Sequence, residues 1–79
     1  METAALAPWR ERNPLREWRR VKGLTVADAA IMLRVSGNTL VKWERGGGTP
    51  SQERMARIAA VTRNRRIAQE WDTWKQQSA

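Results

Sequence analysis

The 79-residue sequence contains no cysteine and no histidine. Disulfide bonds, thiolate nucleophiles, imidazole bases and metal sites built from His or Cys are therefore excluded. Its eight acidic residues are scattered among fifteen Lys and Arg, so they form no paired carboxylates of the kind that acid–base catalysis uses. We expect no enzyme activity, no catalytic residue, no metal and no cofactor.

Long apolar runs are also missing. No stretch approaches the roughly 18 residues of a membrane span, and residues 1–6 lack the basic start of a signal peptide. The chain is 41% hydrophobic and 29% charged, which is typical of a globular protein rather than a disordered one. We expect one small folded domain in the cytoplasm, without a membrane partner.

The sequence is rich in positive charge. Its formal net charge is +7, and the excess of Lys and Arg lies between residues 13 and 66 rather than in the two end segments. A net positive charge of this size favours a polyanion as partner, and nucleic acid is the most common polyanion.

Apolar residues recur at spacings of three and four, which predicts an all-α fold with four to five helices. Each expected helix begins at a residue suited to an N-cap or to the first turn. These start signals are Asn13-Pro14, the capping-box pair Thr25 and Asp28, Ser36, Thr49-Pro50 or Ser51, and Asn64. Gly23 and Gly46 are expected to end the first and third helices.

The apolar positions predict which side chains point inward. In the first expected helix these are Leu15, Trp18 and Val21, which recur every three residues. The other expected inward residues are Val26, Ala29, Ala30, Leu33, Leu40, Trp43, Met55, Ile58, Ala59 and Val61. We expect Trp18 and Trp43 in the core rather than stacked on bases, because both fall on inward faces.

Only Arg34 to Ser36 separate the second and third expected helices, which is the length of the turn in a helix-turn-helix. If Leu40 and Trp43 face inward, the 100° step per residue turns Gly37, Asn38, Val41, Lys42 and Arg45 outward. Asn38 can pair with adenine, Lys42 can donate to guanine or a phosphate, and Val41 can contact a thymine methyl group. An ordinary solvated helix face is the alternative.

The residues around this turn closely resemble the XRE and Cro/C1 family of phage repressor-like DNA-binding domains. The similarity rests on Leu15-Arg16-Glu17-x-Arg19, Lys22-Gly23-Leu24-Thr25, Val35-Ser36, Thr39-Leu40-x-x-Trp43-Glu44-Arg45-Gly46 and Pro50-Ser51. The resemblance implies a five-helix domain whose third helix, from Ser36 to Arg45, reads the major groove of double-stranded DNA, usually as a homodimer.

Carried over by position, the resemblance implies base contacts at Gly37, Asn38, Val41 and Lys42, and a structural pair between Arg19 and Glu44. The expected phosphate contacts are Arg16, Arg34, Ser36, Thr39 and Arg45. Several positions depart from the family pattern, among them Val26 and Arg34. Val26 stands where a phosphate-binding Gln is common, and Arg34 stands where the turn usually has a Gly.

The expected domain plan has an N-terminal tail over residues 1–12, a DNA-binding unit over 13–62 and a C-terminal helix within 63–79. Ile67, Trp71 and Trp74 lie on one stripe of that helix. This stripe could form a dimer interface or pack on the chain's own core, and Trp9 could cover it or belong to a loose tail. The basic residues Arg10 and Arg12 could reach DNA, although Glu11 favours a flexible tail.

These observations predict a sequence-specific transcriptional regulator, a repressor of phage or mobile-element type that acts as a homodimer. No small-molecule ligand is expected. The alternative is a protein-interaction module such as an antitoxin or coactivator, with Ile31, Met32, Trp71 and Trp74 as a docking surface.

Overall fold

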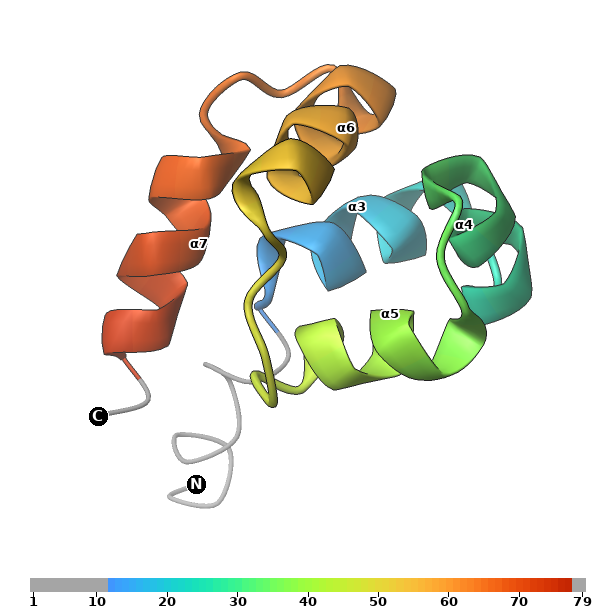
Figure 1. The fold of residues 1–79 in the computed structure, drawn as a ribbon, viewed down its shortest axis with the longest axis horizontal. Helices are drawn as coiled ribbons and strands as arrows, with labels where there is room; N and C mark the ends of the chain where they lie inside the picture. Colours follow the sequence, from blue (N-terminus) through green and yellow to red (C-terminus); the bar gives the residue numbers. More distant parts are fainter. Residues whose placement is uncertain (1–11, 78–79) are drawn as a thin grey trace.

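The computed structural model describes residues 12–77, which form five helices and no strand (Figure 1). The all-α prediction is therefore confirmed. In chain order the helices are α3 (Pro14–Lys22), α4 (Val26–Leu33), α5 (Gly37–Glu44), α6 (Gln52–Thr62) and α7 (Ile67–Gln76).

Four helices begin at side-chain caps that the sequence predicts. The Oδ1 atom of Asn13 accepts the backbone N–H of Arg16, and Ser36 and Ser51 cap α5 and α6 in the same way. Thr25 and Asp28 form the full capping box at α4. Each cap satisfies backbone donors that the first turn of a helix leaves without partners.

Four residues between the helices adopt positive φ angles: Gly23, Arg34, Gly46 and Arg63. The two glycines adopt this backbone region without steric cost, whereas each arginine pays on the order of 1 kcal/mol for it. Arg34, at φ 59°, therefore takes the left-handed conformation of the usual turn glycine, so the helix-turn-helix geometry is kept despite the substitution.

The core collects buried side chains from all five helices. In chain order they are Leu15, Ala29, Ala30, Leu33, Leu40, Trp43, Ile58, Ile67, Trp71 and Trp74. Trp18 packs against this cluster from one side. Val21, expected inward, is instead 76% exposed. Val21 follows Leu15 by six positions, and at 3.6 residues per turn it lies about 120° around the helix from Leu15. Residues that recur every three positions therefore move progressively away from the buried face.

The C-terminal helix completes this core. Helix α7 packs on α3 and α6, and the exposed fractions of Ile67, Trp71 and Trp74 are 1%, 0% and 3%. The rings of Trp71 and Trp74 meet edge to face, with centroids 6.0 Å apart. These three side chains therefore pack on the core of their own chain, and they leave almost no surface for a second subunit. The expectation for Trp9 lies outside the described residues.

Helix α7 starts later than the sequence suggests. Asn64 does not cap it, because the helix begins at Ile67 and Arg66 precedes it without a side-chain cap. Asn64 instead holds the turn, since its Oδ1 atom accepts the Arg66 N–H and its Nδ2 atom donates to Glu70.

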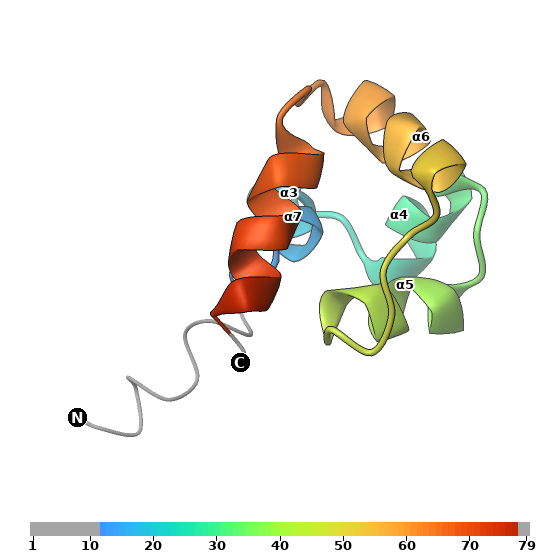
Figure 2. The same ribbon diagram turned by 60° about the vertical axis from the view of Figure 1, so that its left-hand side comes forward.

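Helix α5 and the turn between α6 and α7 lie at opposite ends of the described structure, as both ribbon views show (Figures 1 and 2). Helix α3 lies between these ends. One side of α5 faces the core through Leu40 and Trp43, and its other side is turned outward.

Candidate nucleic-acid interface

Helices α4 and α5 form the helix-turn-helix, and their close packing sets the angle between them. Val26 at the start of α4 lies against the start of α5. A Cβ atom added at Gly37 would meet Cγ1 of Val26 at 3.6 Å, an ordinary packing distance. Val26 thus contributes to the contact between the two helices.

The outward face of α5 is polar and basic. Asn38, Lys42 and Arg45 are exposed, while Gly37 and Val41 are half-buried. This is the arrangement expected when Leu40 and Trp43 are buried. The structure therefore brings the four candidate base-contacting residues and Arg45 together on one helix of eight residues and its C-cap.

Ser36 and Thr39 stand at the N-terminal end of this face and are tied to each other. The Oγ atom of Ser36 accepts the Thr39 N–H at 3.1 Å and donates to Oγ1 of Thr39 at 2.9 Å. Helix N-termini attract anions, so these hydroxyl groups and the first N–H groups of α5 suit a phosphate oxygen.

The side chain of Lys42 lies along the glycine turn that follows α5. A Cβ atom at Gly47 would approach Cγ of Lys42 to 3.2 Å, and one at Gly48 would approach its Cε atom to 3.4 Å. The Gly47 N–H also donates to the Lys42 carbonyl oxygen. The two glycines thus leave room for the stem of the Lys42 side chain beside the turn. Sequence reasoning missed this contact, because no local pattern links Lys42 to the glycines that follow the helix.

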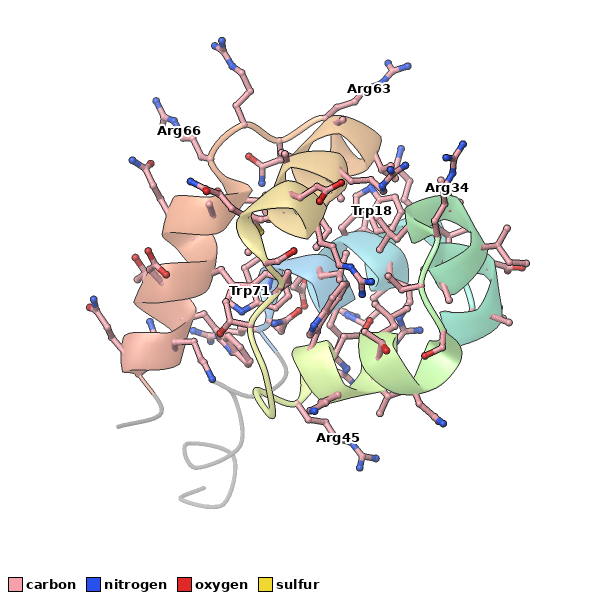
Figure 3. The ribbon with its side chains drawn as sticks, viewed as in Figure 1. Trp18, Arg34, Arg45, Arg63, Arg66 and Trp71 are labelled. Carbon is pink, nitrogen blue, oxygen red and sulfur yellow. The ribbon has the colours of Figure 1, made fainter. Side chains whose placement is uncertain are left out.

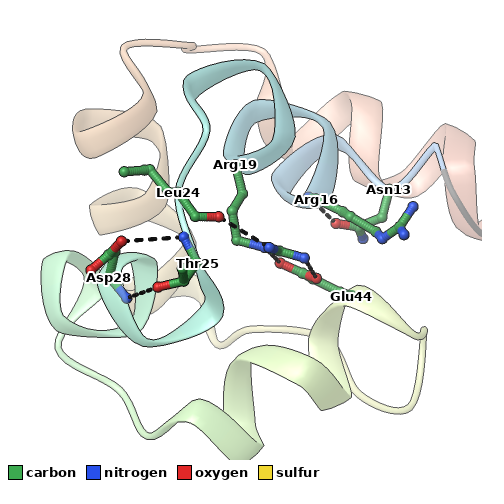
Figure 4. A network of polar contacts seen from close by, with 7 residues as sticks. All are labelled: Asn13, Arg16, Arg19, Leu24, Thr25, Asp28 and Glu44. Carbon is green, nitrogen blue, oxygen red and sulfur yellow. Dashed lines mark hydrogen bonds and ion pairs between the residues drawn. The ribbon is translucent and has the colours of Figure 1, made fainter.

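Arg19 joins α3 to the C-terminal end of α5 (Figure 4). Its Nε and Nη2 atoms donate to the two carboxylate oxygens of Glu44 at 2.8 and 2.9 Å, and its Nη1 atom donates to the Leu24 carbonyl oxygen at 3.1 Å. The hydrogen bonds to Glu44 raise the pKa of Arg19 above its usual value, although burial acts in the opposite direction. The structure thus contains the pair that the resemblance implies, in a bidentate geometry that fixes α5 relative to α3.

Glu44→Ala is expected to lower the free energy of unfolding by about 3 to 5 kcal/mol, because it leaves the partly buried Arg19 guanidinium without its partner. The side chains of Arg19 and Glu44 are 19% and 6% exposed. Thermal unfolding followed by circular dichroism measures the loss. Glu17→Ala is the control, because Glu17 forms an exposed pair with Arg20 that contributes little. Equal melting temperatures for the two variants would contradict the structural role of Glu44.

Helix α7 holds the turn after α5 in place. The Trp74 ring lies against Gly46, where a Cβ atom would meet its Cη2 atom at 3.2 Å. The ammonium group of Lys75 donates to the Gly46 carbonyl oxygen at 2.9 Å. The C-terminal helix therefore supports the turn that follows α5 from within the same chain, which the sequence did not indicate.

The candidate phosphate-contacting residues do not all share one face. Arg16 is half-buried in the first turn of α3, where its N–H is bonded to Asn13. Figure 3 shows the Arg45 side chain directed away from the core below α5, whereas the Arg34 side chain points away at the opposite end of the structure. Arg34 is therefore not placed beside the residues on the outward face of α5.

A family model of helix-turn-helix domains matches residues 15–66. The chain belongs to this family, the XRE and Cro/C1 type of helix-turn-helix, whose members are DNA-binding transcription regulators that bind double-stranded DNA. The match ends where α7 begins. Comparisons with curated proteins and with solved structures gave no match.

Residues 12–77 contain no helix that is long and apolar enough to cross a lipid bilayer. The acidic residues of the same range form no group of three that could hold a metal ion.

Proposed function

We propose that the protein is a sequence-specific regulator that reads the major groove of double-stranded DNA with α5. The observation that carries this proposal is the outward face of α5, where Asn38, Lys42 and Arg45 are exposed together beside the half-buried Val41. The carboxamide of Asn38 matches the N6 and N7 edge of adenine, and Val41 matches a thymine methyl group. Lys42 donates to guanine or to a phosphate at the edge of the helix.

The sequence and the fold family together support a repressor of phage or mobile-element type that acts as a homodimer. One α5 contacts three or four base pairs, which is too few to select a site in a genome. Two-fold pairing doubles the sequence that is read, with half-sites about 34 Å apart. Because Ile67, Trp71 and Trp74 are buried within the chain, this dimer uses other surfaces.

Asn38→Ala tests the base-reading role of α5. It is expected to reduce discrimination at one base position of each half-site by about 1 to 3 kcal/mol, with little change in affinity for random DNA. Operators are first selected from a random pool of duplexes, and affinities for selected and random duplexes are then compared by fluorescence anisotropy. Gln52→Ala is the control, because it also changes an exposed amide residue at the start of a helix, but on α6.

If Asn38→Ala weakens binding to selected and random duplexes by the same factor, Asn38 contacts a phosphate and does not read a base. A control variant that loses as much discrimination as Asn38→Ala would also contradict the assignment to α5.

A protein-interaction module is the second candidate function, and the exposure of two large apolar side chains on α4 favours it. Ile31 is 76% exposed and Met32 is 45% exposed. Trp71 and Trp74, which the sequence groups with them, are buried and leave this surface smaller. Salt-dependent binding to a selected duplex separates the two functions, since an interaction module without DNA recognition has no preferred duplex.

A further inference from the structure

The proposed DNA-reading face uses only part of the positive charge of this protein. Residues 54–66 contain five arginines and no acidic residue. Three of them, Arg63, Arg65 and Arg66, lie in the turn between α6 and α7, at the end of the structure opposite α5. Figure 3 shows the side chains of Arg63 and Arg66 directed outward at that end and the side chain of Arg34 directed outward from the end of α4, whereas Arg45 is directed outward below α5.

We call Arg34, Arg63, Arg65 and Arg66 the distal basic face. All four residues are exposed. Within residues 12–77 none of their guanidinium groups takes part in a hydrogen bond or an ion pair. Glu70 in the first turn of α7 is bonded to Asn64 and is not paired with any of the four. Within residues 12–77 the four guanidinium groups are therefore free to bind an external anion.

Fold stability does not account for these arginines. Arg65 and Arg66 directly precede the N-terminus of α7, where the helix dipole disfavours positive charge. Arg34 and Arg63 hold left-handed backbone conformations that glycine would adopt without cost. Their positions at the C-terminal ends of α4 and α6 offset part of that cost through the helix dipoles. Four exposed arginines of this kind suit a partner that supplies negative charge.

We infer that the distal basic face binds the phosphate backbone of a second DNA duplex, so that one protein molecule holds two DNA segments together. The inference rests on the proposed function for the first duplex, which α5 occupies. A guanidinium group donates two parallel hydrogen bonds to a phosphate, and exposed arginines that form no ion pair suit a uniform polyanion such as duplex DNA. This contact is independent of sequence, because phosphates carry no base information.

The test measures the capture of a second duplex. A selected operator duplex is fixed on beads and loaded with the full-length protein, and a fluorescent duplex without the operator is then added at about 0.1 M salt. Wild-type protein is expected to retain the fluorescent duplex. Arg63→Asn with Arg66→Gln is expected to reduce its affinity about 10- to 100-fold at about 0.1 M salt, because two phosphate contacts are lost. Asn tolerates the left-handed conformation at position 63, so the variant is expected to keep the fold.

Two single variants and one further measurement check that capture depends on the distal basic face. Arg20→Gln removes one positive charge at an exposed position of α3 and is expected to leave capture of the second duplex unchanged. Arg66→Gln is expected to lower the affinity for the second duplex about 5- to 10-fold. Operator affinity, measured by anisotropy in solution, is expected to change little in the Arg63 and Arg66 variants because α5 is unaltered.

Capture that is unaffected by the Arg63 and Arg66 changes would overturn the inference, since bridging would then run through the α5 helices of two subunits. Wild-type protein that binds the operator without capturing a second duplex would overturn it as well and leave the proposed function intact. If no operator can be selected but Arg63 and Arg66 still govern binding to duplex DNA, the proposed function fails and the phosphate-binding face stands.

Discussion

Trp71→Ala is expected to unfold most of the protein at room temperature. Trp71 is completely buried among side chains from the other helices, and truncating a buried Trp costs about 3 to 5 kcal/mol. A domain of this size has a total stability of similar magnitude. Loss of the helical signal in circular dichroism, or a large fall in the urea midpoint, measures the effect.

Trp71→Phe and Val21→Ala are the matched variants. Phenylalanine keeps most of the buried aromatic surface and removes an indole N–H that has no acceptor within residues 12–77, so its cost is smaller than that of alanine. Val21→Ala removes an exposed side chain and is expected to leave the melting temperature nearly unchanged. If Trp71→Ala melts like the wild type, α7 does not belong to the core.

Operator affinity is expected to fall by about 10³- to 10⁵-fold between roughly 50 and 200 mM salt. The reason is that a dimer in contact with about 6 to 10 phosphates releases the counterions that those phosphates hold, which gives a slope near −5 to −9 in a plot of log K against log salt. Anisotropy titrations of a selected duplex over a salt series measure the slope.

A variant with Lys42→Gln and Arg45→Gln is expected to make this slope shallower by about 0.9 for each phosphate contact that is lost. Arg20→Gln is the control at an exposed position on α3. A slope close to zero for the wild type, or the same slope in both variants, would contradict phosphate binding at the α5 face.

The sequence predicts the helices and their caps well, because caps are local. Asn13, Thr25, Ser36 and Ser51 each act on a backbone N–H within three residues, so sequence spacing is enough to find them. The inward positions Leu40 and Trp43 follow from the same local periodicity, and they determine which residues of α5 face outward.

Contacts between distant segments could not be predicted in this way. The support of Gly46 by Trp74 and Lys75 joins residues on different elements and depends on how α7 docks. The position of Arg34 at the end opposite Arg45 depends on the angle between α4 and α5, which no spacing in the sequence contains. The pair of Arg19 and Glu44 is predictable only through the family resemblance, because periodicity does not link residues on separate helices.

The most direct test of major-groove reading by α5 replaces purine N7 atoms in a selected operator. N7 lies in the major groove, and 7-deaza-adenine or 7-deaza-guanine removes this acceptor while leaving the phosphates in place. Wild-type binding is expected to weaken by about 1 to 3 kcal/mol at the contacted purines, and Asn38→Ala is expected to become insensitive at one of those positions. Binding that stays unchanged at every substituted purine would contradict the account.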